Sequence, residues 1–197
     1  MKKLSTLLCL TLITAFVFAQ CNGRYQTEIF SSVTKTTVNY SDVYNDNEHK
    51  MDIYTPNGDT VTNRPVILYM HAGAFYGGDK TMTDCVDFCE SMAKRGYVTA
   101  SLNFRITNVL SFLSSQAEQY KIVLKSVADA KAAVRYFRKD HAINANTYGI
   151  DPSTIFVGGY SSGGVIAIHM AFIDAISDLP TAPINIQAIV NSLGGLD

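Results

Sequence analysis

A single turn, residues 158–164 with the sequence GGYSSGG, constrains this chain more than any other stretch. It joins a short apolar run at 154–157 to a stretch of helical character at 165–176. A serine in a tight turn from strand to helix is held in a strained backbone conformation, which pushes its hydroxyl out of the sheet. The pattern Gly-x-Ser-x-Gly therefore predicts a nucleophile elbow centred on Ser161.

The residues around Ser161 fit this prediction in turn. Gly159 and Gly163 leave room for the strand and the helix to approach each other. The amide of Ser162 opens the helix, where it can stabilise an oxyanion. Ser162 does not fit as the nucleophile, because that register places Tyr160 where the first glycine must be. The alternative interpretation is a glycine-rich connection whose serines are incidental.

Nucleotide-binding patterns are excluded at the same turn. A dinucleotide fingerprint requires glycine at the position of Tyr160, and a P-loop requires lysine where Val165 follows the glycines. We therefore expect no nucleotide site at this turn. No cofactor is expected for the chain.

The N-terminus predicts export. Two lysines, the apolar run from Leu7 to Phe18 and a cleavage position after Ala19 predict a secretory signal peptide, residues 1–19. The run is shorter than the roughly 20 residues of a membrane span, so no stable membrane anchor is expected. The predicted location is secreted or periplasmic. Cys21 offers lipidation as an alternative, but Gln20 is larger than the residue that such a site prefers.

Charge and cysteine content narrow the function further. Removing residues 1–19 takes two of the 16 basic residues and none of the 17 acidic ones, which leaves a net charge of 14 − 17 = −3. Without a basic patch, nucleic acid is not an expected partner. Cys21, Cys85 and Cys89 remain, and an oxidising compartment favours disulfides. The odd count leaves one thiol whose partner lies in sequence not given, or which is buried and free.

A metal site is not expected. Cys85 and Cys89 are one helical turn apart, a spacing that suits two ligands, but no histidine lies nearby.

The apolar patterns predict an α/β fold in residues 20–197, which are expected to be the N-terminal portion of a single domain. Polar and apolar residues alternate over 33–40 and 49–54, which predicts an antiparallel strand pair. From residue 65 onward strands and helices are expected to alternate, with strands at 66–71, 97–104, 154–157 and 184–191 and helices at 81–95, 119–139 and 165–176. The first of these helices, 81–95, has Thr83 as its expected cap. Such alternation predicts a parallel sheet with right-handed crossovers.

The loop after His71 is the second functional candidate. Residues 72–80, AGAFYGGDK, follow the C-terminal end of a predicted central strand, where α/β sheets bind ligands. Small residues leave backbone amides free to point at a ligand, and the amides of Gly73 and Ala74 are the candidate donors. The alternative is a merely flexible glycine loop.

With these stretches placed, the chain resembles the α/β-hydrolase superfamily, in the carboxylesterase and lipase-like branch that carries an HGGG-type oxyanion motif. Residues 71–80, HAGAFYGGDK, are similar to HGGAWxxGDK; residues 95–105, RGYVTASLNFR, to RGYxVxSxNYR; and residues 149–164, GIDPSTIFVGGYSSGG, to GxDPxxIxxxGxSAGG. The likeness extends from about residue 49 to the end. Ala72 replaces the first glycine, which is tolerated if its φ is negative, and Ser162 replaces an alanine.

The resemblance implies a secreted serine ester hydrolase. In this interpretation Ser161 attacks the ester carbonyl and the amides of Gly73, Ala74 and Ser162 bind the oxyanion. His71 would shape the oxyanion loop, and Gly159 and Gly163 would support the elbow. The substrate would be a small-molecule or polymer-linked ester. A peptidase of the same fold and a non-catalytic binding module remain as alternatives.

The resemblance also implies that part of the machinery is missing. In the family an Asp or Glu and then a His follow the serine, after strands seven and eight, whereas 184–191 is strand six by our count. We expect the C-terminal strands and the triad acid and base to lie outside this chain, which alone would be inactive. His169 is expected to be a surface or packing residue of the elbow helix, and His49 and His141 surface residues. Asp174 and Asp178 are too far along the elbow helix to serve as the acid, and Asp197 is expected in a loop after strand six, whereas the family's acid follows strand seven.

Overall fold

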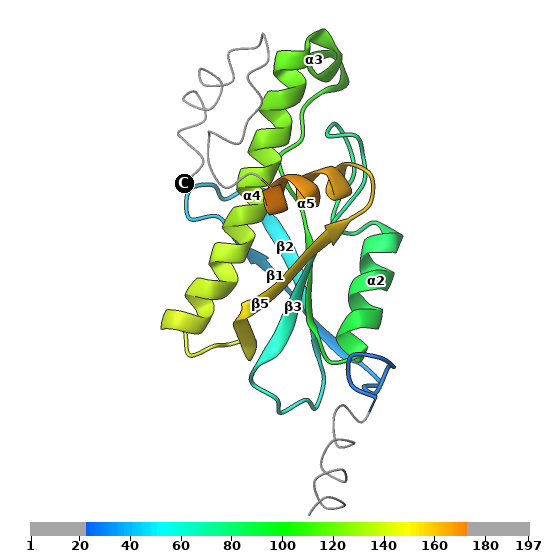
Figure 1. The fold of residues 1–197 in the computed structure, drawn as a ribbon, viewed down its shortest axis with the longest axis vertical. Coiled ribbons are helices and arrows are strands. Elements are labelled where there is room, and N and C mark those ends of the chain that lie inside the picture. The colour runs from blue at the N-terminus through cyan, green and yellow to red at the C-terminus, as the bar shows by residue number, and fades with distance from the viewer. Residues whose placement is uncertain (1–22, 173–197) are drawn as a thin grey trace, which may run out of the picture.

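A five-stranded sheet forms the centre of the computed structural model, which describes residues 23–172 (Figure 1). The strands are β1 (Val33–Asn39), β2 (Lys50–Pro56), β3 (Arg64–Met70), β4 (Val98–Leu102) and β5 (Ile150–Gly159). The helices are α2 (Thr83–Lys94), α3 (Val109–Ser114), α4 (Gln116–Ile143) and α5 (Ser162–Phe172). The strand order is β1-β2-β4-β3-β5, with β3 parallel to both of its neighbours.

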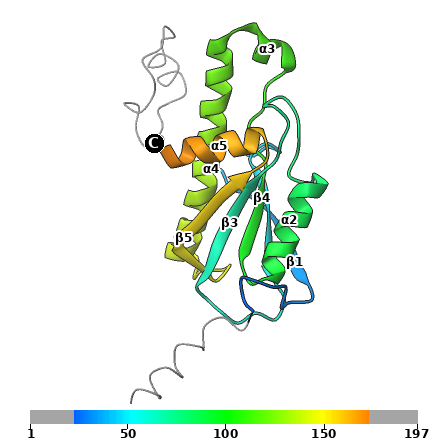
Figure 2. The ribbon, with the colours of Figure 1, turned by 45° about the vertical axis from the view of Figure 1, so that its right-hand side comes forward.

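Helices cover both faces of the sheet: α2 lies on one face, and α4 and α5 lie on the other (Figure 2). Alternate residues of β3 and β4 enter the larger core beneath α4 and α5. This core includes Val66, Leu68, Met70, Val98, Ala100, Leu102, Val127, Phe137 and Ile166. A smaller cluster of Tyr54, Cys89 and Ala93 packs beneath α2. The central strands are therefore buried on both faces, as their continuous apolar sequence predicts.

The predicted strand pair is confirmed, since β1 runs antiparallel to β2 with Val33 opposite Pro56 and Asn39 opposite Lys50. Parallel pairing of β3 with β4 and β5 confirms the α/β class. The strand predicted at 184–191 lies outside the described residues, as do the signal peptide and Cys21.

Helix boundaries show where local patterns were insufficient. The expected cap at Thr83 is wrong: Met82 occupies the cap position of α2, and no side chain caps the helix. The helix predicted at 119–139 is longer, because Ser115 caps α4 by accepting a hydrogen bond from the Glu118 amide at 3.2 Å. The sequence did not predict α3, although Asn108 caps it in the same way.

Cys85 and Cys89 are both free and buried within α2. Burial raises the pKa of the Cys85 thiol to about 11 and that of the Cys89 thiol to about 12. For these two residues the buried-thiol alternative is confirmed. Within residues 23–172 no group of three or more His, Cys, Asp or Glu side chains could hold a metal ion. Nor does any helix in this part of the chain have the length and apolar character to cross a bilayer.

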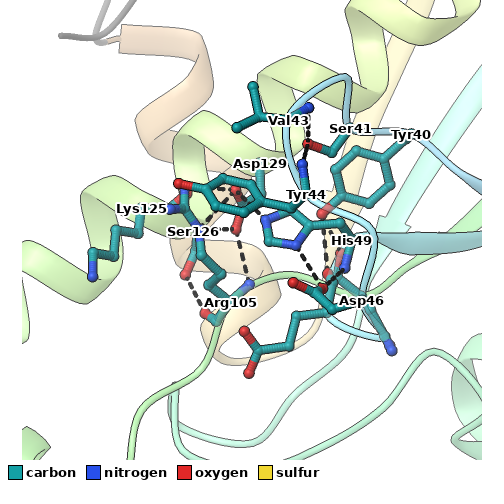
Figure 3. A network of polar contacts seen from close by, with 12 residues as sticks. Tyr40, Ser41, Val43, Tyr44, Asp46, His49, Arg105, Lys125, Ser126 and Asp129 are labelled. Carbon is teal, nitrogen blue, oxygen red and sulfur yellow. Dashed lines mark hydrogen bonds and ion pairs between the residues drawn. The ribbon is translucent and has the colours of Figure 1, made fainter. Parts of the chain in front are cut away.

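The expected surface position of His49 is wrong. His49 is 2% exposed and lies between two carboxylates: Nδ1 is 2.7 Å from Asp46 Oδ1, and Nε2 is 3.5 Å from Asp129 Oδ1 (Figure 3). The second contact is an ion-pair distance without hydrogen-bond geometry. Burial alone would lower the pKa of His49, but the two carboxylates outweigh it and raise this pKa above its ordinary value.

Asp129 connects His49 to Arg105, which follows β4. The Arg105 guanidinium lies 2.7 Å from Asp129 Oδ1, and the Arg105 amide donates to Asp129 Oδ2 at 2.9 Å (Figure 3). Because Asp129 lies on α4 and His49 directly precedes β2, this network joins three separate segments. The network holds the β1–β2 connection and α4 together at the end of the sheet where β4 terminates.

Candidate active site

The predicted elbow has the backbone geometry that the sequence implies. β5 ends at Gly159 and α5 begins at Ser162, so that Tyr160 and Ser161 form the turn between them. Ser161 has φ +53°, a left-handed conformation that residues with a side chain rarely adopt. Ser161 is exposed, whereas Ser162 is 2% exposed. The strained turn thus presents the first serine to solvent and buries the second.

Gly159 and Gly163, on each side of the turn, lie so close to the end of β3 that no side chain fits at either position. A Cβ on Gly163 would lie 2.1 Å from the carbonyl oxygen of Met70, and one on Gly159 would lie 2.5 Å from the same oxygen. Real Cβ atoms do not approach other heavy atoms so closely. The absence of a side chain at these two positions therefore lets the turn lie against the end of β3.

The elbow lies directly beside the loop that follows β3, residues 71–80. The Tyr160 amide donates to the Met70 carbonyl oxygen at 3.3 Å, and Ser162 Oγ donates to the His71 carbonyl oxygen at 3.4 Å. β3 and β5 are parallel neighbours, with Met70 opposite Gly159. Two stretches about 90 residues apart in sequence therefore meet at one end of the sheet, the end at which α/β sheets bind ligands.

The loop itself has an unusual backbone. Gly73, Ala74 and Phe75 have φ values of +134°, +51° and +66°. The carbonyl oxygen of Gly73 accepts hydrogen bonds from the amides of Tyr76 and Gly77, at 3.1 and 3.0 Å. Within residues 23–172, the amides of Gly73 and Ala74 have no protein acceptor. Two of the three predicted donors are thus left free by a tightly turned loop.

Glycine is required at position 73, because a Cβ there would lie 1.9 Å from the Gly77 carbonyl oxygen. Ala72, the departure from the family pattern, is absent from the residues of positive φ, so its methyl group is accommodated. The condition set by the sequence for this substitution is met.

His71 is positioned as part of the loop. Its ring is 1% exposed and stacks on Phe104, with centroids 4.2 Å apart and planes at 12°. Nδ1 lies 2.6 Å from the carbonyl oxygen of Ala72, and since a carbonyl only accepts, Nδ1 carries the hydrogen. Burial lowers the pKa of His71, which keeps the ring neutral near pH 7. These contacts favour the predicted role in shaping the loop.

Within the described part of the chain, His169 and His141 form no hydrogen bond with Ser161. His169 Nδ1 is 2.8 Å from the Val165 carbonyl oxygen of its own helix. His141 is exposed near the end of α4. Between residues 23 and 172 no histidine or carboxylate is hydrogen-bonded to Ser161. Asp174, Asp178 and Asp197 lie outside the described residues.

Comparison with known proteins agrees with this geometry. Residues 51–197 match the family model BD-FAE. The chain belongs to the BD-FAE family. Members of this family are esterase-like α/β hydrolases, and the α/β-hydrolase fold expected from the sequence is confirmed.

Three relatives illustrate the breadth of the likeness. Esterase B1 of Culex pipiens is 28% identical over 132 residues, which cover 66% of this chain and 23% of that protein. The non-reducing polyketide synthase atr1 of Stereocaulon alpinum is 24% identical over 157 residues, which cover 78% of this chain and 6% of the synthase. Esterase 2 of Thermogutta terrifontis has 26% identity and a TM-score of 0.53, with 78% of this chain and 48% of that one covered.

The same Thermogutta esterase has been solved with butyrate bound and after phosphonylation by sarin. This BD-FAE chain spans less than half the length of that esterase in each comparison. It spans a smaller share of the two curated relatives.

Proposed function

We propose that this chain is the nucleophile-bearing part of a secreted serine carboxylesterase. The observation that carries the proposal is the left-handed backbone of Ser161 at the end of β5, beside a loop with two unpaired amides. A strained, exposed serine next to free donors serves acyl transfer, whereas a binding module has no use for the strain.

The chemistry follows from these positions. Ser161 Oγ attacks the ester carbonyl carbon, and the carbonyl oxygen becomes an oxyanion. The amides of Gly73, Ala74 and Ser162 donate hydrogen bonds to it, and Ser162 stands at the positive end of α5. Each such donor lowers the barrier by about 3 kcal/mol. A base takes the Ser161 proton during the attack and returns it to the alkoxide, which leaves as the alcohol when the C–O bond breaks. Water then attacks the acyl-serine in the same way, which releases the carboxylic acid and restores Ser161.

A proton acceptor completes the proposal. His71 is buried and bonded to its own loop, and His169 is bonded to its own helix, so neither is assigned as the base. We place the base in polypeptide beyond residue 197, in the chain order Ser, Asp or Glu, His that the α/β-hydrolase pattern implies. The partial coverage of the Thermogutta esterase supports this placement.

The proposed substrates are small-molecule or polymer-linked esters. The butyrate found in the Thermogutta esterase supports short acyl chains as the first to test. Secretion rests on the signal-peptide pattern of residues 1–19. The mass of the exported protein tests it, since cleavage after Ala19 leaves Gln20 at the N-terminus.

The activity is tested with the full-length protein on p-nitrophenyl acetate, butyrate and octanoate. We expect turnover that Ser161→Ala lowers by about 10⁶ in kcat, the loss seen when a triad nucleophile is removed. Ser114→Ala, at an exposed serine of α3, is the matched control and retains the wild-type rate. Hydrolysis by Ser161→Ala at a rate near that of the wild type contradicts the assignment.

A further inference from the structure

The oxyanion loop ends at Lys80, whose side chain forms a buried ion pair. Lys80 Nζ lies 2.9 Å from Asp52 Oδ2, and the two side chains are 10% and 1% exposed. Asp52 lies on β2, and its other oxygen accepts a hydrogen bond from Thr37 Oγ1 at 2.6 Å. The loop is thus connected to a strand that is not a neighbour of β3 in the sheet.

The backbone of Lys80 is also held by hydrogen bonds. Its amide donates to Asn103 Oδ1 at 2.5 Å, and its carbonyl oxygen accepts from Ser101 Oγ at 2.6 Å. Asn103 Nδ2 donates in turn to Asp79 Oδ2 at 3.0 Å. Burial opposes ionisation of Asp79, but hydrogen bonds from Asn103 and Thr81 outweigh it and lower the pKa of Asp79 to about 2. Asp79 is therefore a carboxylate across the neutral range and accepts a hydrogen bond from Asn103.

A buried ion pair of this kind adds little to the free energy of unfolding, but it holds the backbone segments attached to it in one geometry. Removing two charges from water costs about as much as their attraction returns, so a buried ion pair is often no more stabilising than apolar side chains of the same size. What the pair does provide is a single geometry for the groups attached to it. Here those groups include the loop that carries the two unpaired amides.

The loop needs such an anchor because its conformation is strained. Ala74 and Phe75 have positive φ values, +51° and +66°, which their side chains disfavour. A strained segment persists only when the structure holds both of its ends. β3 holds the first end at His71, and Lys80 holds the second, six residues after Ala74.

We infer that Lys80 and Asp52 are positioning residues that place the amides of Gly73 and Ala74 for oxyanion binding. The inference rests on the proposed function of the loop. Neither side chain is assigned a contact with substrate. Their effect is expected in the step that develops the oxyanion, because misplaced amides weaken binding of the transition state more than binding of the substrate.

The test uses the full-length enzyme and p-nitrophenyl butyrate. Lys80→Met keeps the length of the side chain and removes the charge. We expect kcat to fall by about 10- to 100-fold while KM changes by less than about twofold, since only a transition-state interaction is lost. Lys35→Met is the matched control, because Lys35 Nζ lies 4.0 Å from the same Asp52 oxygen but on a half-exposed side chain. Its kcat should equal that of the wild type.

A second variant separates position from folding. Lys80→Met alone leaves the buried Asp52 carboxylate with Lys35, 4.0 Å away and half-exposed, as its cationic neighbour. The double variant Asp52→Asn with Lys80→Met therefore removes both charges of the buried pair together. We expect the melting temperature to recover while kcat stays low. Lys80→Arg keeps the charge on a different head group, and an intermediate kcat is expected.

The outcomes distinguish this inference from the function on which it rests. If the wild-type enzyme neither hydrolyses the ester nor reacts with a fluorophosphonate at Ser161, the proposed function has failed. If the wild type is active and the folded double variant keeps kcat within twofold, the positioning role is overturned. An equal loss of kcat in Lys35→Met also overturns the positioning role, because the loss would then follow from removing any positive charge near Asp52.

Discussion

The left-handed backbone of Ser161 is expected to make the protein less stable than it would be with glycine at this position. Ser161→Gly and Ser161→Ala both remove the hydroxyl, but only alanine keeps the Cβ that the φ of +53° disfavours. Comparing the two variants therefore isolates the backbone strain from the chemistry of the serine. Glycine should be the more stable of the pair.

The expected difference is small but measurable. The left-handed conformation costs a residue with a Cβ about 1–2 kcal/mol. Glycine returns about 0.5–1 kcal/mol of this, because it loses more backbone freedom on folding than alanine does. Taking the midpoints of these two ranges, the net advantage of Ser161→Gly over Ser161→Ala is about 0.75 kcal/mol. For a domain of this size that corresponds to a rise in melting temperature of about 1–4 °C.

Thermal and urea unfolding of the full-length variants measure this difference. Ala128→Gly, in the middle of α4, makes the same chemical change in an ordinary helical conformation and should lower stability by about 1 kcal/mol. The opposite signs at positions 161 and 128 are the signature of strain at the elbow. A Ser161→Gly variant that melts no higher than Ser161→Ala refutes the reasoning.

Three further predictions follow from the described contacts. Gly163→Ala should lower both melting temperature and kcat, the latter by at least about 100-fold, because its Cβ would lie 2.1 Å from the Met70 carbonyl oxygen; Gly164→Ala, with its nearest atom at 3.3 Å, should be far milder, and equal effects would contradict the account. The raised pKa of His49 means that protonated His49 stabilises the fold below about pH 6.5 and that this contribution is lost as the pH rises through the raised value. The stability difference between wild type and His49→Gln should therefore shrink across that range, and a constant difference would show that the ring is not charged. Residues 20–197 expressed alone should be poorly soluble and hydrolyse p-nitrophenyl acetate no faster than background, whereas ordinary enzyme rates would identify His71 or His169 as the base.

The elbow and the oxyanion loop could be predicted from the sequence because their signals are local. Gly159 and Gly163 flank Ser161 at fixed spacing, and the small residues after His71 follow directly on a buried strand. Parallel pairing of β3 and β5 then brings the two stretches together by a general rule of α/β sheets. The positive φ values of Ala74 and Phe75 could not be predicted from the sequence, because neither alanine nor phenylalanine favours that backbone conformation.

The polar networks could not be predicted, because their members are distant in sequence. Lys80 and Asp52 are separated by 28 positions, and each alone resembles an ordinary charged surface residue. His49 was expected at the surface, because nothing in the sequence near it indicates that Asp129 of α4 lies 3.5 Å from its ring. Short helices such as α3 are missed for a related reason, as six residues are too few to establish a helical period.

The identity of the nucleophile is tested most directly by a fluorophosphonate probe on the full-length protein, with the modified residue located by mass spectrometry. We predict one adduct, on Ser161, that is absent from Ser161→Ala and largely retained in Ser162→Ala, because only the amide of Ser162 takes part. An adduct that persists in Ser161→Ala, or that maps to another residue, would contradict the account.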